Sequence, residues 1–485
     1  MPKLKLTGKE LRKIGYPEGP VISIAMNIME RSFKHLSKAD VLEILASILQ
    51  SPNQYAHDEK LGIIAEALLP KPKTEQDEIP LVDKGIHFNV FGAEGIEHGA
   101  LQQMITASKI PIAVAGALMP DAHAGYGLPI GGVLATENAV IPYGVGVDIG
   151  CRMCLSLFDI KPEELKNKED YFTRELNEAT LFGAGSTFQE AADHEVLQRK
   201  EFDELGFLKG LQDRAWKQLG TSGSGNHFVE FGVVEILDDD DENTLSIPGG
   251  KYIGLLSHSG SRALGANVAN HYTKVAKEKR RLPGEASNLA WLSLDEQEGI
   301  EYWMSMNLAG DYASACHHII HQKIARRLGR EPIKMVENHH NFAWKEIYNG
   351  KEVIVHRKGA TPAGKGVLGI IPGSMTAPGF IVKGKGEEAS INSASHGAGR
   401  KMSRTAALKS INHTTLTDIL AKEGVRLLGG GLDEAPMAYK DIHEVMKAQQ
   451  QLVTTVGLFY PKIVKMDGAV PKQWKKKKDK QVLGK

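Results

Sequence analysis

The stretch KYIGLLSHSGS, residues 251–261, sets an apolar run directly against a loop of serine, glycine and histidine. Short apolar runs that end at glycine or proline predict strands followed by loops. The same pattern of short apolar runs begins near Gly85 and recurs in GYGLPIGGVLA (125–135), KEVIVHRKGA (351–360) and GVLGIIPGS (366–374). Helices interrupt it, as in LDEQEGIEYWMSMNLAGDYASACHHIIHQKIARRL (294–328). Because no regular alternation of strands and helices and no repeat is visible, we expect one large mixed α+β domain, not a barrel or solenoid.

Helical sequence precedes this domain. SKADVLEILASILQ (37–50) places a serine at the N-cap position and apolar residues at helical spacing, and PKPKTEQDEIP (70–80) has the composition of a linker. We therefore expect a helical extension with its linker over residues 1–80, the large domain over 81–470, and a basic tail over 471–485. The runs DDDDEN (238–243) and KKKKDK (475–480) are expected to be solvated and to have no role in a site.

The composition narrows the classes of function. Lysine plus arginine equals aspartate plus glutamate, 59 of each in 485 residues, so no overall positive charge attracts nucleic acid or an anionic membrane. Any site for a polyanion must then be a local patch. Three cysteines are too few for a disulfide framework and suit a reducing compartment. The first sixteen residues lack the apolar run of a signal peptide, so we expect a soluble cytoplasmic protein with no membrane association.

Residues able to bind metal recur in the glycine-rich loops. A lone histidine is usually structural, but several histidines in separate loops favour one shared site. A carboxylate, a thiolate and several imidazoles suit a divalent transition metal; a thiolate can bridge two ions, and ligand softness alone favours zinc. The candidates are Asp148 and Cys151 in GVDIGC (146–151), Asn226 and His227 in GTSGSGNHFVE (220–230), His258 in HSGSR (258–262), His340 and Asn341 in NHHNF (338–342), and His396 in SASHGAGR (393–400).

Three other patterns are interpreted as structural. CRMC (151–154) lacks a second cysteine pair and a thioredoxin context, so Cys154 is expected in the core. His317 and His321 lie four apart on a helix, but the glutamate of a metalloprotease is missing, which favours a structural use. GATPAGKG (359–366) resembles a Walker loop, but Gly366 replaces the Ser or Thr and strand-like sequence follows. We keep that loop only as a candidate phosphate contact.

Nine short motifs, taken in their order along the chain, resemble those of a known protein family. The chain resembles the RtcB family of RNA-splicing ligases from about Gly85 to about Lys465. The resemblance implies a GTP- and manganese-dependent ligase that joins RNA 3′-phosphate or 2′,3′-cyclic phosphate ends to 5′-hydroxyl ends. It also implies a single α+β fold with a central metal-binding cleft, a monomer, and an activating protein similar to archease. The motifs are MPDAHAGYGLPIGG (119–132), GVDIGC, GSGNHFVE (223–230), HSGSR, HHN (339–341), HRKGA (356–360), PGSM (372–375), SASHGAGRKMSR (393–404) and DEAPMAYKDI (433–442).

The resemblance also implies roles for single residues. Cys151 would bridge two manganese ions, one also held by Asp148, His258 and His340, the other by His227 and a nucleotide phosphate. His396 would be the guanylylated histidine, and Asp121 a further acid of the site, unless Asp121 only caps a turn. The nucleotide would be held by Asn226, Glu230, Asn341, Ser374, Gly397, Gly399 and Lys465. RNA phosphates would be bound by Arg214, Arg262 and Arg404, with Arg400 nearby, unless these arginines form surface ion pairs.

Departures from the family pattern keep alternatives open. GSMTAPGF (373–380) differs from the usual GSMGT sequence, which affects the assignment of Ser374, and Asp213 stands where some relatives have a second arginine. The N-terminal extension could bind a partner, select substrates or cover the core. A metal-dependent RNA cyclic phosphodiesterase or phosphatase would use the same ligands without a nucleophilic His396, and a silent RNA-end-binding protein would need only the arginines. The choice between tRNA splicing and RNA repair is open.

Overall fold

The structure is a computed structural model, and it describes residues 4, 6–17, 20–58, 60–69, 77–190, 192–237 and 244–468. The acidic run 238–243, the basic tail 471–485 and linker residues 70–76 lie outside the described residues. The chain divides into two compact units, Met1–Asp77 and Glu78–Lys485. Among the described residues, no helix has both the length and the apolar character needed to cross a bilayer.

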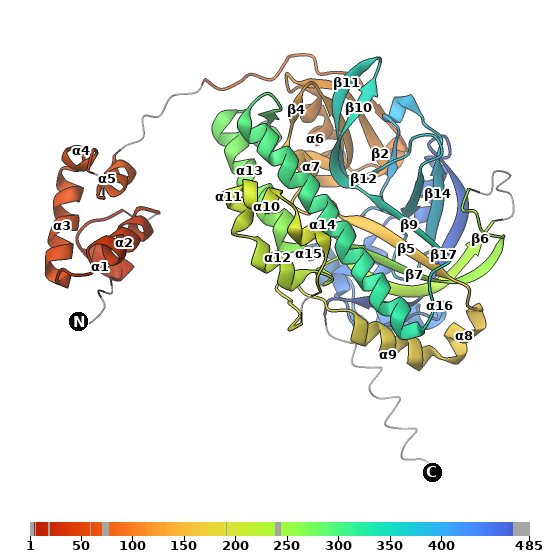
Figure 1. Cartoon of the computed structure of the whole chain (residues 1–485). Helices are drawn as coiled ribbons and strands as arrows, with labels where there is room; N and C mark the ends of the chain where they lie inside the picture. The colour runs from red at the N-terminus through yellow and green to blue at the C-terminus, as the bar shows by residue number, and fades with distance from the viewer. Residues whose placement is uncertain are drawn as a thin grey trace, which may run out of the picture. The chain divides into compact units, whose positions relative to one another are not determined.

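The N-terminal unit is helical, as the capping and spacing signals predict (Figure 1). Ser37 caps the third helix, since its hydroxyl accepts from the Asp40 backbone N–H at 3.3 Å. Val41, Leu45 and Ile48 of that helix are buried in a core formed only by side chains of this unit. The helices are α1 (Gly8–Lys13), α2 (Pro20–Ser32), α3 (Lys38–Gln50), α4 (Pro52–Tyr55) and α5 (Gly62–Leu68).

Two large sheets form the second unit, which has the mixed α+β architecture expected. In the larger sheet, β16 (Arg426–Leu427) pairs in parallel with β17, and every other pairing is antiparallel. Its remaining strands, in spatial order, are β13 (Leu368–Ile371), β14 (Gly379–Gly384), β17 (Val453–Met466), β6 (Phe228–Ile236), β7 (Gly250–Ser259), β5 (Arg152–Phe158) and β9 (Lys334–His339).

The second sheet and two short pairs complete the strands of this unit. The order in the second sheet is β1 (Phe88–Val90), β2 (Ala113–Tyr126), β3 (Leu128–Thr136), β11 (Lys351–Lys358) and β10 (Asn341–Tyr348). The short pairs are β12 (Ala360–Pro362) with β15 (Ser393–Ser395), and β4 (Ala139–Val140) with β8 (Leu292–Ser293). The strand β13, not a helix, follows GATPAGKG, in agreement with the rejection of a Walker loop.

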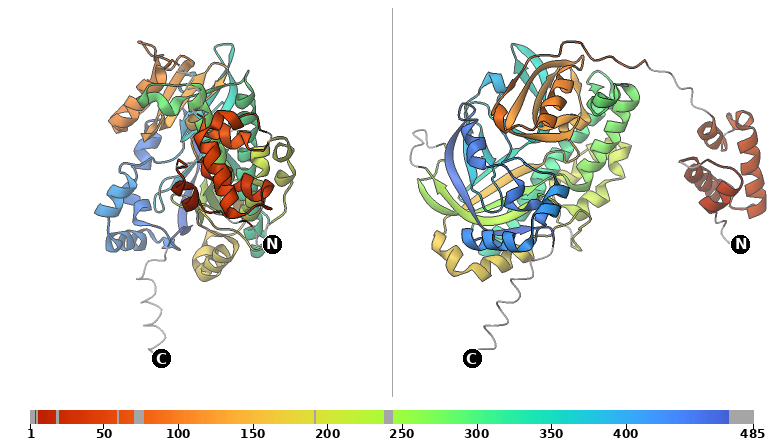
Figure 2. Two further views of the ribbon diagram at one scale, coloured as in Figure 1. Left: turned by 90° about the vertical axis from the view of Figure 1, so that its left-hand side faces the viewer. Right: turned by 180° about the vertical axis from the view of Figure 1, so that it is seen from behind.

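Two long helices, α13 (Arg262–Lys279) and α14 (Gln297–Leu328), pack side by side across one face of this unit (Figures 1 and 2). The predicted long helical segment is confirmed as α14, which packs on β5 and β7. The other α-helices are α6 (His98–Ser108), α7 (Pro142–Val145), α8 (Pro162–Asn167), α9 (Glu169–Ala179), α10 (Glu201–Glu204), α11 (Gly206–Lys209), α12 (Gln212–Gln218), α15 (Arg404–Ser410), α16 (His413–Glu423) and α17 (Ile442–Lys447). The 3-10 turns are η1 (Ala93–Gly95), η2 (Glu195–Gln198), η3 (Gly284–Leu289), η4 (Glu388–Ser390), η5 (Leu432–Glu434) and η6 (Pro436–Ala438).

Antiparallel pairing brings four segments to one end of the larger sheet. Cys151 and His227 directly precede β5 and β6, while His258 lies near the end of β7 and His340 directly follows β9. Because β7 is antiparallel to β5 and β6, and β5 to β9, the beginnings of two strands meet the ends of the other two. The strand order therefore gathers residues that are almost 190 positions apart in the sequence.

Candidate metal and nucleotide site

The gathered side chains form two groups that share Cys151. In one group, Cys151 Sγ lies 3.1 Å from His258 Nε2, which is 3.2 Å from His340 Nε2. In the other, His227 Nε2 lies 3.5 Å from Cys151 Sγ and 2.8 Å from Asp148 Oδ2. The resemblance implies that Asp148 shares an ion with His258 and His340, whereas in this geometry its carboxylate lies against His227. In both arrangements the Cys151 thiol is common to the two groups.

A backbone contact defines the ligand atom of His258. Its Nδ1 lies 3.1 Å from the Asn226 carbonyl oxygen, which can only accept, so Nδ1 carries the proton and Nε2 presents a lone pair. That lone pair faces Cys151 and His340. Burial lowers the pKa of His258 to about 3, helped by neighbouring His227, so the ring is neutral as a metal ligand must be.

The charges in this group fit a cation. Burial opposes ionisation of Asp148, but neighbouring His227 brings the pKa of this carboxyl below its usual range. Burial, reinforced by the Asp148 carboxylate, raises the pKa of the Cys151 thiol well above its usual value. A bound cation reverses that preference, because coordination deprotonates a thiol outright. Nδ1 of His227 and of His340 is buried without a hydrogen-bond partner among the described residues. The donor set is therefore suited to one or two divalent transition-metal ions.

Two glycines allow the loops to approach the ligands closely. A Cβ atom at Gly260 would lie 1.9 Å from Asp148 Oδ1, and one at Gly223 would lie 1.9 Å from His227 Nδ1. Any side chain at either position would displace a ligand. The glycines of HSGSR and GSGNHFVE are therefore required by packing against the site.

His396 is held by Asp121, the acid that the sequence left as either a site residue or a turn cap. One carboxylate oxygen of Asp121 lies 2.6 Å from His396 Nδ1 and accepts from the backbone N–H groups of His396 and Gly397, at 3.1 and 3.4 Å. Asp121 is fully buried, and although burial opposes its charge, His396 brings the pKa of this carboxyl below its usual value. An ionised carboxylate can only accept, so Nδ1 of His396 carries a proton, and in the neutral ring Nε2 is then the nitrogen with the free lone pair.

A cavity of about 590 Å³ adjoins both the metal ligands and His396. His396 also contacts the metal group directly, because its ring centroid lies 5.0 Å from that of His340. Of the residues expected to hold a nucleotide or metal, those that line the cavity are Asn226, Glu230, His258, His340, Ser374, His396, Gly397 and Gly399. A volume of this size is in the range of small-molecule sites.

Two expected nucleotide residues lie elsewhere. The Lys465 ammonium donates to the carbonyls of Asn177 and Thr180, both at 3.0 Å, while its neighbours Val464 and Met466 line the cavity. Side chains alternate along a strand, so Lys465 lies on the opposite face of β17, where burial lowers its pKa to about 8. The Asn341 side chain bonds to the Asp148 carbonyl and the Gly359 N–H, so it supports the ligand loop.

The three expected RNA arginines have different environments. Arg404 lines the cavity with its side chain 45% exposed, and its guanidinium donates to Asp433 at 2.6 Å. Arg262 is buried, bonded to the Thr221 hydroxyl and the Gly183 carbonyl, beside the loop that carries His227. Arg214 is exposed on α12. The structure therefore brings only Arg404 of the three to the cavity.

Cys154, His317 and His321 form a second cluster of potential ligands within 4.8 Å of one another. All ring nitrogens of the two histidines are already hydrogen-bonded. His317 contacts the Ser257 hydroxyl and the Ser259 carbonyl, and His321 contacts the Ser156 and Ser257 hydroxyls, at 2.6 to 3.1 Å. Because these contacts saturate the imidazoles, the structural interpretation of this pair is supported.

Sequence reasoning assigned no role to single residues of DEAPMAYKDI, yet Glu434 and Tyr439 line the cavity. The Tyr439 hydroxyl donates to Glu434, and the Arg400 guanidinium lies 5.2 Å from the centre of the Tyr439 ring. The motif itself was the only signal, because neither residue belongs to a pattern with an obvious chemistry. They contribute to the cavity lining together with the candidate metal ligands His258 and His340.

Comparisons with known proteins agree with this site. A family model described as tRNA-splicing ligase RtcB matches residues 103–206 and 201–466. The RNA-splicing ligase RtcB of Escherichia coli K12 is 33% identical over 395 residues, covering 74% of this chain and 92% of the relative. The tRNA-splicing ligase RtcB of Archaeoglobus fulgidus is 33% identical over 417 residues, covering 71% and 86%. An RNA-splicing ligase RtcB homolog of Entamoeba dispar is 30% identical over 418 residues, covering 72% and 78%. The family match thus defines an RNA ligase, and its site contains side chains that could hold metal ions. The chain belongs to the RtcB family.

Proposed function

We propose that this protein is a GTP- and manganese-dependent RNA ligase that joins 3′-phosphate or 2′,3′-cyclic phosphate ends to 5′-hydroxyl ends through a guanylylated His396. The observation that carries the proposal is the pairing of His396 Nδ1 with the buried Asp121, at the wall of a cavity that also exposes His258 and His340. The RNA substrate follows from relatives named RNA- or tRNA-splicing ligases.

Two manganese ions would be held by Asp148, Cys151, His227, His258 and His340, with Cys151 shared. Bound there, they would neutralise phosphate charge and stabilise leaving groups. The protein's own contribution is to keep the imidazoles neutral and correctly oriented, as the Asn226 carbonyl does for His258.

In the first step, Nε2 of His396 attacks the α-phosphorus of GTP. A P–N bond forms, the bond from that phosphorus to the bridging oxygen breaks, and pyrophosphate leaves. The attacking species is the neutral imidazole, in which the bond from Nδ1–H to Asp121 leaves the lone pair on Nε2. The positive charge that develops on the ring lies 2.6 Å from the Asp121 carboxylate.

The next steps use the RNA ends. An oxygen of the RNA 3′-phosphate attacks the guanylyl phosphorus, the P–N bond breaks, and the RNA carries a guanosine joined through a diphosphate. The 5′-hydroxyl of the second RNA then attacks the RNA phosphorus, loses its proton to solvent, and GMP leaves as the phosphodiester forms. A cyclic phosphate end must first be hydrolysed. Arg404 lies on the cavity wall, where a guanidinium can bind such phosphates.

Glu230 is placed to select the base. It lies in the same cavity, buried, where desolvation raises the pKa of its carboxyl well above the usual value. A carboxyl in an apolar wall gains most from a ligand that offers hydrogen-bond partners, as the N1 and N2 donors of guanine do. We therefore assign Glu230 to guanine; Asn226, Ser374, Gly397 and Gly399 would contact other parts of the nucleotide. Lys465 would have to leave its present carbonyl partners to join them.

The test is covalent labelling. The purified protein is incubated with manganese and GTP labelled at the α-phosphate, denatured, and examined for acid-labile label, alongside His396→Ala. Label that requires His396 supports the proposal. Absence of label on the metal-loaded wild type rejects it and leaves the alternative, a metal-dependent RNA cyclic phosphodiesterase or phosphatase, which would cleave cyclic phosphate ends and ignore GTP.

A further inference from the structure

The N-terminal unit is outside the part of the chain that the family model matches. The family model begins at residue 103, and the described side chains in the core of this unit all belong to the unit itself. All the ligands, His396 and the cavity belong to the second unit. The first unit is therefore an addition, and its surface should reveal what it adds.

The charge of this unit is divided along the sequence. Residues 1–38 contain eight lysines and arginines against three acidic residues, whereas residues 39–77 contain three against seven. The whole chain is balanced at 59 of each sign, so this polarity is a local feature. In a chain without net charge a polyanion site requires a local basic patch, and the first half of this unit offers one.

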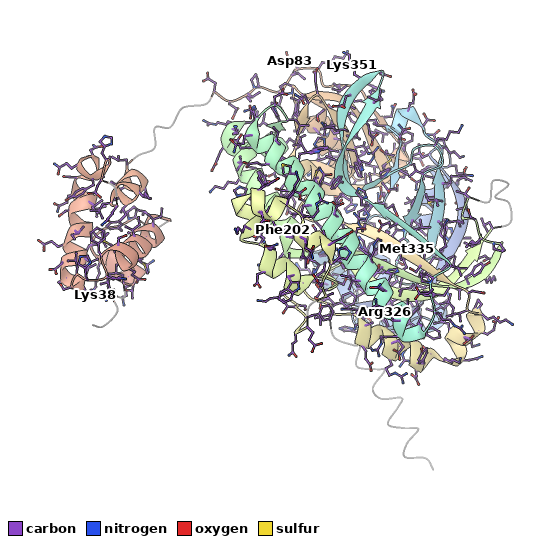
Figure 3. All side chains as sticks on the ribbon, in the orientation of Figure 1. Lys38, Asp83, Phe202, Arg326, Met335 and Lys351 are labelled. Carbon is purple, nitrogen blue, oxygen red and sulfur yellow. The ribbon has the colours of Figure 1, made fainter. Side chains whose placement is uncertain are left out.

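The basic side chains lie together on adjoining elements. Lys9, Arg12 and Lys13 are three and four positions apart on α1, so they share one side of that helix, and all three are exposed while Leu11 is buried. Lys38, labelled in Figure 3, begins α3, and its ion pair with Glu10 at 2.6 Å joins the start of α3 to α1. We define the basic face as Lys9, Arg12, Lys13 and Lys38.

Three described acidic residues of α1, α2 and α3 are engaged locally. Glu10 accepts from Thr7, Glu30 accepts from the Leu6 N–H at 2.9 Å, and Asp40 accepts from the N–H of Ser37. These bonds fix the turns between the helices and hold the carboxylates against the backbone. The lysines extend from the same elements into solvent, exposed at Lys9 and Lys13.

We infer that the basic face binds the phosphate backbone of the RNA substrate and so tethers it to the ligase. This inference rests on the proposed function for the identity of the polyanion. Lysines supply charge without reading bases, so the contact would be independent of sequence and strongly dependent on salt. Because the chain as a whole is neutral, a basic face on a separate unit would be useful for capturing RNA ends before they enter the cavity.

The experiment measures RNA binding by the full chain. A short single-stranded RNA with a 3′-phosphate is titrated with wild type and with the triple variant K9E/R12E/K13E across about 50–200 mM salt. The plot of log K against log salt has a negative slope. Losing three phosphate contacts should make this slope shallower by about 2, at ~0.7 per contact on a single strand. Affinity at the low-salt end should fall at least tenfold, while covalent labelling of His396 by GTP stays unchanged.

A matched pair of single variants controls for charge. Lys9 and Lys60 are both exposed lysines of the same unit, but Lys60 lies in the acidic half. K9E should weaken RNA binding and K60E should not. Equal effects of the two, or an unchanged salt slope in the triple variant, would overturn the inference. Because labelling by GTP is measured separately, failure of the proposed ligase mechanism would be recognised independently of the RNA titration.

Discussion

Asp121 shows how one buried side chain can set the reactivity of another. Three donors converge on a single oxygen of its carboxylate, while the other oxygen is buried without a partner among the described residues. The backbone donors fix the position of the accepting oxygen, and that oxygen fixes the tautomer of His396. Gly399 completes the arrangement, since a Cβ there would lie 2.1 Å from the Asp121 carbonyl oxygen.

Replacing Asp121 with asparagine tests the charge of this residue separately from its geometry. In Asp121→Asn the amide oxygen can still accept from the three donors, so His396 keeps its tautomer, but the negative charge opposite the developing imidazolium is lost. We expect the single-turnover rate of GTP labelling at saturating GTP to fall by about 10²-fold, ~2.7 kcal/mol in the barrier. Asp121→Ala, which also frees the ring, should be slower still. A rate for the asparagine variant close to wild type would show that the charge is not used.

Glu230 predicts a pH dependence of stability. Burial raises the pKa of its carboxyl well above the ordinary 4.5, so as pH rises past 4.5 the unfolded state releases a proton that the folded state still holds. A carboxyl whose pKa is higher in the folded than in the unfolded state stabilises the folded state. This contribution is fully present at low pH and is lost as pH rises above 4.5. The glutamine of Glu230→Gln does not titrate. As pH rises, the free energy of unfolding of this variant should therefore increase relative to that of wild type by at most ~1.4 kcal/mol per pH unit. Urea unfolding of nucleotide-free protein from about pH 5 to 8 measures this gain; a constant difference would contradict it.

At the scale of elements, strand β7 connects the site to the core. Its His258 faces the metal group, while the adjacent Ser257 and Ser259 face α14 and contact its histidines. The positions of the protons in the hydrogen bonds between β7 and α14 follow from one group that can only accept, the Ser259 carbonyl. The Ser259 carbonyl must receive Nε2–H of His317, so Nδ1 of His317 accepts from Ser257, which in turn accepts from Nε2–H of His321. Burial lowers the pKa of both histidines, to about 3 for His321, which keeps the rings neutral.

This chain of hydrogen bonds predicts a coupling between α14 and metal binding. His317→Leu would leave the Ser259 carbonyl without its donor and Ser257 without its acceptor, at about 1–3 kcal/mol for each buried group. Since His258 lies between these serines, we also expect weaker Co²⁺ binding, measured by the thiolate absorption band. His317→Gln, which keeps a donor near the carbonyl, should recover part of both losses. Ile320→Val, a change of about 0.5–1.5 kcal/mol on the same helix, should leave the absorption band unchanged.

Elements were easier to predict from sequence than contacts within the site. The N-terminal helices and α14 follow from capping and long-range periodicity, which are local properties of the chain. The contact between Cys151 and His258 could be expected, because both are potential metal ligands in glycine-rich loops. The contact between Asp148 and His227 depends on side-chain packing that no local sequence pattern encodes. Likewise, Lys465 lies behind the sheet because of strand pleating and a register that only the folded sheet fixes.

At the scale of the whole molecule, the two units differ in how much core stabilises them. The N-terminal unit buries thirteen apolar side chains in its own cluster, whereas the second unit holds five further clusters. Small domains bury a lower fraction of their surface and are correspondingly less stable. The family model lies wholly within the second unit, which is consistent with a complete catalytic core there.

Removing residues 1–77 should therefore leave the chemistry intact. The fragment 78–485 retains the Ile79 N–H bond to the Arg281 carbonyl, at 2.8 Å, and the Val82 N–H bond to the Lys109 carbonyl, at 2.9 Å, so its first segment remains anchored. We expect labelling of His396 by GTP within about threefold of the full chain. Calorimetry of the full chain should show two transitions, and the one at lower temperature should be missing from the fragment, because a unit with so small a core melts first. If the fragment instead lost the higher transition or failed to label, the second unit would depend on the first for its stability, and the assignment of catalysis to residues 78–485 alone would be wrong.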